Sequence, residues 1–152
     1  MDCEKIHTFL VIFIILAILI YYAPAVFLFI HTNSSDNLSK SEIFKLVEKN
    51  EDILLGDISA NNFNDSSEIK GIVDVNIEEE IINFYCGGYG MRPSTGYYGF
   101  YYTEDDNMTA IWCSGSPLKQ DGKGYSWEED DGDNRYYTEK ICDNFYYYEA
   151  HF

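Results

Sequence analysis

The longest apolar stretch of the chain lies near its N-terminus, where no charged residue interrupts Ile6–Ile30. As a helix, these roughly 25 residues would measure about 37 Å, which exceeds the roughly 30 Å hydrocarbon core of a bilayer. The pattern therefore predicts a transmembrane anchor at residues 6–30, with residues 1–5 as a cytosolic start. The alternative is a signal peptide cleaved at the small-x-small sequence Ala23-Pro24-Ala25. The apolar residues Val26–Ile30 continue beyond that point and favour the uncleaved anchor.

Residues 31–40 are polar and predict a linker, and residues 41–152 are expected to form the folded domain. The first element of that domain is a predicted amphipathic helix, Lys40–Leu55. Ser39 and Glu42 have the spacing of a capping box, and Gly56 is expected to end the helix. Since the apolar positions recur with helical spacing, we expect one face of the helix to cover a sheet.

From Ile69 onward, short runs of β-branched and aromatic residues are separated by turn residues. The predicted strands are Ile69–Ile77, Ile81–Cys86, Tyr97–Thr103, Met108–Cys113, Gly124–Glu129, Arg135–Cys142 and Phe145–Phe152. The short connections favour antiparallel pairing of consecutive strands. The predicted fold class is therefore α+β, with one helix packed on an antiparallel, meander-like sheet of about five to seven strands.

The two central strands are joined by a glycine-rich stretch, Gly87–Gly96, in which we expect a long loop. Gly99, in the middle of the second central strand, predicts a bulge or the close approach of a ring or backbone. The Gly87–Gly96 stretch is interpreted either as a structural connection or as part of a binding pocket. In the second case, the pocket would be lined by Tyr89, Arg92, Tyr97 and Tyr98.

A formal net charge of −16 and 14 tyrosines determine the expected surface. An acidic surface of this kind repels phosphate backbones, which excludes nucleic acid as a partner. The same charge favours cationic partners. Because tyrosine combines an apolar ring with a polar tip, its abundance suits both a thin β-rich core and a binding surface.

Histidines are too few and too peripheral to predict a catalytic site. His7 and His31 lie at the two ends of the apolar segment, so a nucleophile–histidine pair in the domain would have to use His151. A hydrolase or transferase would need His151 or a carboxylate pair in a cleft, and replacing His151 and Glu149 would test it. We expect no catalytic residue, because a penultimate position is usually frayed unless a strand holds it.

Motifs for metals, cofactors and redox chemistry are also missing from the sequence. The cysteines Cys86, Cys113 and Cys142 contain no CxxC pair, and they fit either one disulfide with a free thiol or three buried thiols. The acidic run Glu128–Asp133 lacks the alternating ligands and distal glutamate of a calcium loop, so it is interpreted as a solvated turn. Gly87–Gly96 has neither GxGxxG nor a Walker lysine. We therefore expect no metal and no cofactor.

Two segments resemble a known group of proteins: FYCGGYGMRPSTGYYGFYYTEDD (Phe84–Asp106) and WEEDDGDNRYYTEKICDNFYYYEAHF (Trp127–Phe152). The chain is similar here to small uncharacterised membrane-anchored, Tyr-rich proteins of Gram-positive bacteria. The resemblance implies one apolar N-terminal segment, a short helix and a β-rich domain in the cell envelope. That group has no assigned activity, so the resemblance implies no site residue.

The expected function is that of an acidic, Tyr-rich binding or interaction module, held at the cell membrane by a single span and displayed outside it. Its partner would be an envelope protein or a wall polymer. Two alternatives remain open. One is a cell-envelope hydrolase or transferase, and the other is an inhibitory or immunity-type partner of a basic protein.

Overall fold

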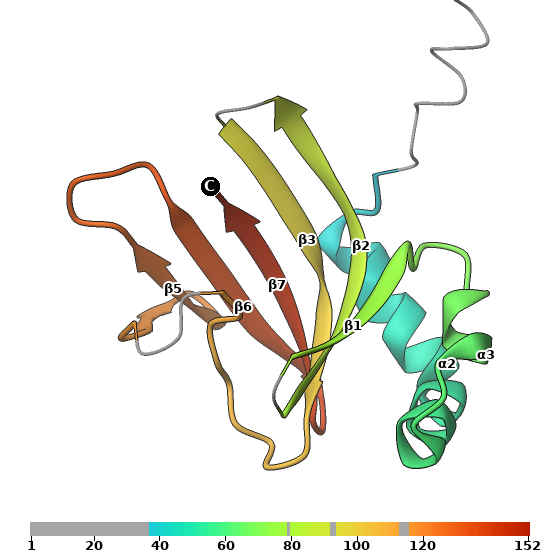
Figure 1. Cartoon of the computed structure of the whole chain (residues 1–152). Coiled ribbons are helices and arrows are strands. Elements are labelled where there is room, and N and C mark those ends of the chain that lie inside the picture. Colours follow the sequence, from blue (N-terminus) through green and yellow to red (C-terminus); the bar gives the residue numbers. More distant parts are fainter. Residues whose placement is uncertain (1–36, 79, 92–93, 113–115) are drawn as a thin grey trace, which may run out of the picture. The chain divides into compact units, whose positions relative to one another are not determined.

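The computed structural model describes residues 37–78, 80–91, 94–112 and 116–152. They form two helices and one seven-stranded antiparallel sheet (Figure 1). The elements are α2 (Lys40–Ala60), α3 (Asn64–Ser67), β1 (Asp74–Glu78), β2 (Ile81–Met91), β3 (Ser94–Thr103), β4 (Lys119–Asp121), β5 (Gly124–Glu128), β6 (Arg135–Cys142) and β7 (Phe145–His151). The predicted α+β class, with a helix packed on an antiparallel sheet, is confirmed.

The sheet consists of two meanders that meet in its middle. Its strand order is β1-β2-β3-β7-β6-β5-β4. Consecutive strands are neighbours within β1–β3 and within β4–β7, as predicted, but β3 pairs with β7, which is far away in sequence. In that pairing Phe100 is opposite Tyr147, and Tyr101 is opposite Tyr146. The connection between the two meanders, residues 104–118, is called the crossover segment below.

Both edge strands differ from the prediction. β1 begins at Asp74 and not at the predicted Ile69, and it ends at Glu78, just past the predicted Ile77. It begins later because the chain turns before it, where the Ile72 N–H bonds to the Ile69 carbonyl at 3.0 Å. β4 lies within a stretch predicted as loop and pairs Lys119–Asp121 with β5. Edge strands bury little apolar surface, so their local sequence pattern is weak.

Helix α2 starts as predicted and ends later than predicted. The capping box is present, and the Glu42 carboxylate accepts a hydrogen bond from the Ser39 backbone N–H at 2.8 Å. The predicted end at Gly56 is wrong. The helix continues to Ala60, and Asn61 ends it in the left-handed conformation with φ of +50°. Asparagine tolerates this conformation, so it takes the role that the prediction gave to glycine.

Helix α2 lies against one face of the sheet, called the helix face (Figure 1). Ile43, Val47 and Leu54 are completely buried and belong to the same core as Phe84 and Phe100. Alternation along the strands brings these two rings to one face, where they stack with centroids 4.6 Å apart. This core is the main apolar contact between the helical layer and the sheet.

The N-terminal end of α2 is tied to the sheet by Lys40. Its ammonium group forms an ion pair with Glu139, which is only 7% exposed, and donates a hydrogen bond to the Tyr137 hydroxyl at 3.1 Å. Burial alone would lower the pKa of Lys40, but the contacts with Glu139 and Tyr137 outweigh it and raise the pKa. Lys40, the first residue of α2, thus also makes polar contacts with β6.

The glycine-rich stretch predicted as a loop belongs to the two central strands, so that prediction is wrong. β2 continues to Met91 and β3 begins at Ser94. A register shift between Tyr85 and Gly87 marks a bulge in β2. Gly90 has a φ of +92°, which glycine adopts at little cost, so the extended hairpin follows a path that other residues would resist.

Two glycines of β3 lie beneath aromatic rings. A Cβ atom at Gly96 would lie 2.3 Å from the ring of Tyr89, its partner on β2. At Gly99, a Cβ atom would lie 2.3 Å from the Phe84 carbonyl oxygen and 3.0 Å from the ring of Tyr148. The predicted close approach at Gly99 is therefore confirmed, with both a backbone and a ring as neighbours.

The crossover segment packs on the sheet face opposite α2, called the crossover face. The strand predicted at Met108–Cys113 is not formed by its described residues, 108–112. Instead, the Tyr101 hydroxyl accepts a hydrogen bond from the Thr109 N–H at 3.0 Å and donates one to the Thr109 carbonyl at 2.9 Å. Ile111 is 1% exposed. The Tyr101 side chain of β3 thus makes the hydrogen bonds to this segment that a neighbouring strand would otherwise make.

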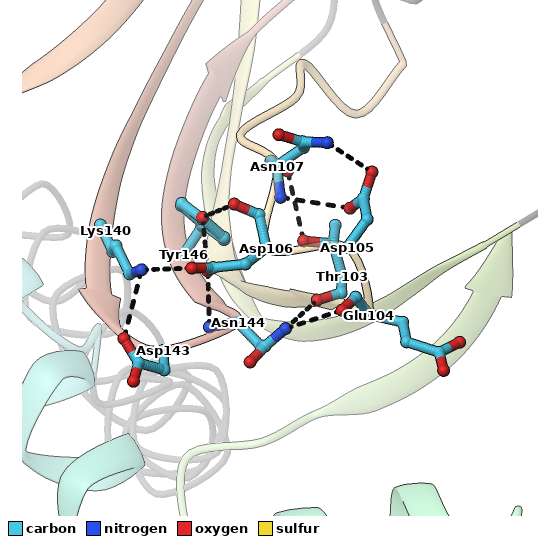
Figure 2. Close-up of polar contacts among 9 residues, drawn as sticks. All are labelled: Thr103, Glu104, Asp105, Asp106, Asn107, Lys140, Asp143, Asn144 and Tyr146. Carbon is cyan, nitrogen blue, oxygen red and sulfur yellow. Dashed lines mark hydrogen bonds and ion pairs between the residues drawn. The ribbon is translucent and has the colours of Figure 1, made fainter.

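The start of the crossover segment is fixed to the turn between β6 and β7, as Figure 2 shows. The Asp106 carboxylate accepts hydrogen bonds from the Tyr146 hydroxyl at 2.7 Å and the Asn144 N–H at 2.8 Å, and it pairs with Lys140 at 2.6 Å. The Asn144 side chain donates to the Thr103 carbonyl at 2.7 Å. The hydrogen bond from Lys140 is the largest of the contacts that lower the pKa of Asp106 to about 2.

The N-terminal part of the chain is described from residue 37 onward. The predicted cytosolic start (1–5) and anchor (6–30) lie outside the described residues, in which no helix is both long and apolar enough to cross a membrane. The end of the predicted linker (31–40) packs on the domain. Leu38 contacts the core, and Asn37 accepts a hydrogen bond from Tyr98 at 2.9 Å.

Candidate binding site

The crossover face carries a second aromatic cluster. Alternation along β7 directs Tyr146 and Tyr148 to this face, whereas Phe145 and Tyr147 belong to the helix face. Tyr101 stacks on Tyr146 with centroids 5.2 Å apart. The aromatic residues of the domain therefore form two layers, one on each side of the sheet.

Trp112 extends this second cluster to the surface. Its φ is +67°, a conformation that is costly for a bulky residue, and its side chain is 42% exposed. The indole stands edge-on to the buried ring of Tyr148, with centroids 5.4 Å apart and an interplanar angle of 88°. Trp112 thus combines a strained backbone with an indole that contacts the cluster and is partly exposed to solvent.

Tyr97, Trp112 and Phe152 line a cavity of about 330 Å³, called the aromatic pocket below. The Trp112 ring lies 6.0 Å from Tyr97 at 69°, and 6.1 Å from Phe152 at 71°. Phe152 is held there because its N–H and carbonyl both bond to the backbone of Thr95, at 3.0 and 2.8 Å. The three rings are steeply tilted and form the walls of a corner.

A carboxylate of strand β1 lies beside the aromatic pocket. The Glu78 carboxylate lies 3.5 Å from the indole nitrogen of Trp112, which donates a long hydrogen bond to it. The Tyr85 ring on β2 is 6.3 Å from that of Tyr97. Negative charge therefore lies at the edge of one of the three rings, and a carboxylate beside aromatic rings is a combination that attracts a cation.

Tyr148 and Tyr85, two tyrosines near the pocket, remain neutral phenols near neutral pH. Burial raises the pKa of Tyr148 well above its ordinary value. Burial is also the main cause of the raised pKa of Tyr85. These rings therefore contribute apolar surface and π-electron density without a charge of their own.

The residues predicted to line one pocket are divided between the two faces. Tyr97 lines the aromatic pocket. Tyr98, its neighbour in sequence, belongs to the helix-face core and is 5% exposed. Tyr89 lies over Gly96, and its hydroxyl donates to Glu149 at 2.8 Å. Arg92 lies outside the described residues, and the structure does not bring the other three together.

A polar cluster on the helix face contains His151, which β7 holds in place. Its Nε2 lies 2.9 Å from the Ser94 hydroxyl, and its Nδ1 is buried without a hydrogen-bond partner among the described residues. Glu149 instead accepts hydrogen bonds from the hydroxyls of Tyr89 and Tyr147. A serine–histidine pair is thus present, but the acid that orients the histidine in a catalytic triad is not found in the described part of the chain.

The described cysteines are free thiols in environments that disfavour the thiolate. Burial raises the pKa of Cys86 to about 12, and burial is the largest cause that raises the pKa of Cys142 to about 11. Cys113 lies outside the described residues. No group of three or more potential metal ligands occurs in the described ranges.

Trp112, Phe152 and Glu78 were not identified from the sequence as site residues. The pairing of β3 with β7 and the path of the crossover segment bring Trp112 and Phe152 together with Tyr97, and Trp112 contacts Glu78. Strand alternation from Tyr146 through Tyr148 places Phe152 on the crossover face as well, so the local sequence pattern could have indicated this residue. No such pattern indicated Trp112, because its segment forms no strand.

No protein-family model matches the chain, and no curated protein or solved structure matches it either.

Proposed function

We propose that this chain is a non-enzymatic binding protein whose crossover face captures a basic segment of a partner protein. The observation that carries this proposal is the aromatic pocket with the Glu78 carboxylate at the indole of Trp112. The net charge of −16 supports it, because a strongly acidic protein attracts basic partners over long distances. A pocket of about 330 Å³ is at the small end of ligand sites and suits a single side chain.

We further propose that residues 6–30 anchor the protein in the membrane and that the domain faces outward, toward partners in the cell envelope. The support is the length of this uncharged segment. Protease treatment of intact cells that carry the full-length chain tests the orientation. Digestion of the domain supports the proposal, whereas protection in intact cells and digestion only after lysis would contradict it.

Binding is tested with the full-length chain and a blocked heptapeptide in which lysine alternates with glycine. The chain has two tryptophans, so Trp127→Phe leaves Trp112 as the only indole reporter. We expect the peptide to change Trp112 fluorescence with an affinity that falls between 50 and 300 mM NaCl. A peptide with norleucine in place of lysine is the uncharged control. Equal binding of the two peptides, or none, refutes the proposal.

A serine hydrolase is a second candidate function, because the Ser94 hydroxyl lies 2.9 Å from His151 Nε2. A fluorophosphonate probe labels only an activated serine hydroxyl. Labelling of Ser94 that disappears in His151→Ala would favour a hydrolase. The missing orienting acid leads us to expect no labelling.

A further inference from the structure

Lys40 shows how this fold already holds one ammonium group. Its Nζ atom lies 4.6 Å from the ring centroid of Tyr137, 5.6 Å from that of Tyr147 and 5.8 Å from that of Phe44. The carboxylate of Glu139 balances its charge. These distances are within the range of cation–π attraction, so three rings and one carboxylate, called the Lys40 cage below, surround this cation.

The aromatic pocket has the same components on the opposite face of the sheet. In the Lys40 cage, the ring of Tyr147 lies 6.2 Å from Phe44 at 49° and 6.4 Å from Tyr137 at 60°. In the aromatic pocket, the ring of Trp112 lies at 6.0 and 6.1 Å from its two neighbours, at 69° and 71°. Each set is three tilted rings with a glutamate carboxylate beside them, Glu139 in one and Glu78 in the other.

We propose that the aromatic pocket receives the ammonium group of a lysine side chain from the basic partner segment, in preference to the guanidinium group of an arginine. This inference rests on the proposed function and specifies the group that it recognises. A compact, roughly spherical cation contacts several tilted ring faces at once. A planar guanidinium stacks well on only one of them.

The pocket also favours a cation with few N–H donors. A guanidinium carries five N–H donors in a fixed plane and an ammonium group carries three, and burying such donors without acceptors is unfavourable. The pocket walls formed by described residues are aromatic, and the neighbouring carboxylate of Glu78 already accepts the indole N–H of Trp112. A trimethylated ammonium has no N–H donor and is more weakly hydrated, so methylation of the lysine should maintain or strengthen binding.

The test compares four blocked heptapeptides that differ only at the residue alternating with glycine: lysine, trimethyllysine, arginine or norleucine. Trp112 fluorescence is measured in the full-length Trp127→Phe chain. We expect the lysine peptide to bind about fivefold more tightly than the arginine peptide, and the trimethyllysine peptide to bind at least as tightly as lysine. Lysine and arginine carry the same charge, so the comparison isolates the shape and donors of the cation.

Two variants locate the effect. Phe152→Leu removes one wall of the pocket and should lower the affinity for lysine by about fivefold, leaving the lysine and arginine peptides alike. Tyr125→Leu changes a tyrosine that is 39% exposed on β5 and does not line the pocket, so it should have no effect.

The outcomes separate this inference from the proposed function. If lysine and arginine peptides bind equally and Phe152→Leu changes neither, the inference is refuted while binding of basic segments stands. If arginine binds more tightly, the ammonium preference is refuted in the same way. If no peptide binds, the proposed function and this inference both fail.

Discussion

Gly99→Ala should destabilise the protein strongly, because β3 has no room for a methyl group at this position. A Cβ atom there would lie 2.3 Å from the Phe84 carbonyl oxygen and 3.0 Å from the ring of Tyr148. Neither neighbour moves easily. The carbonyl belongs to the β2 backbone, and Tyr148 is completely buried. Overpacking typically costs about 1–3 kcal/mol, and a contact with backbone belongs in the upper part of that range, at about 2–3 kcal/mol.

The same chemical change at Gly56 is the matched control. Nothing lies within 4 Å of a Cβ atom built there, and the residue is inside α2. Alanine is favoured over glycine in a helix interior, so Gly56→Ala should stabilise the protein by about 0.5–1 kcal/mol. One substitution type therefore has opposite signs at two positions of one protein.

Urea unfolding of the full-length chain, followed by circular dichroism, measures both effects through the transition midpoint at constant slope. If Gly99→Ala unfolds within about 0.5 kcal/mol of the parent, the close approach of β2 and Tyr148 to β3 is refuted. The register of the central strands would then be wrong as well. A destabilised Gly56→Ala would refute the continuation of α2 past this glycine.

Three further predictions concern the ion pairs and a thiol. Lys40→Met leaves the buried Glu139 without its cation and should lower the free energy of unfolding by about 1–2 kcal/mol. The loss is smaller than for a fully buried pair because Lys40 is 40% exposed. Equal urea midpoints for this variant and the exposed-site control Lys49→Met would refute the prediction. The pKa of Asp106 is lowered from 3.8 to about 2, so its contribution to stability is complete above about pH 4 and is lost as the pH falls toward 2. In Asp106→Asn, melting temperature should vary less with pH over this interval, and an unchanged slope would contradict the contacts in Figure 2. Burial raises the pKa of Cys86 to about 12, so iodoacetamide at pH 8 should alkylate this thiol far more slowly in the folded chain than in urea. Peptide mass spectrometry measures the two alkylation rates, and equal rates would contradict the burial of Cys86.

The fold class and the faces of the central strands could be predicted because they depend on local patterns. Ile82, Phe84 and Cys86 are alternate residues of the predicted strand Ile81–Cys86, and all three belong to the helix-face core. Alternation requires no knowledge of the partner strand. The start of α2 was predictable for a similar reason, since Ser39 and its capping partner are three residues apart.

The loop prediction for the glycine-rich stretch is wrong because these glycines accommodate aromatic rings from neighbouring strands. Glycines in a row usually indicate a loop, but Gly96 and Gly99 are strand positions that leave space for the rings of Tyr89 and Tyr148. Those neighbours become apparent only when the registers of β2, β3 and β7 are known. Composition alone does not distinguish a glycine that permits a turn from one that permits a close contact.

The candidate site was only partly predictable, because the chain assembles it from distant segments. Adjacent residues on a strand face opposite ways, so Tyr97 and Tyr98 could not share a pocket once their segment was assigned to a strand. Trp112 and Phe152 reach Tyr97 through the crossover segment and through the β3–β7 pairing. The contact of Trp112 leaves no periodic signal in the sequence, whereas alternation along β7 places Phe152 on the crossover face.

The central claim is that basic segments bind in the aromatic pocket, and photo-crosslinking tests it most directly. The lysine–glycine heptapeptide, with a diazirine on one side chain, is irradiated with the full-length chain, and the adducts are mapped by mass spectrometry. We predict adducts on Trp112, Phe152 or Tyr97, which line the pocket. Adducts confined to the acidic turn at Glu128–Asp133 would contradict the claim and show that the peptide binds by charge alone.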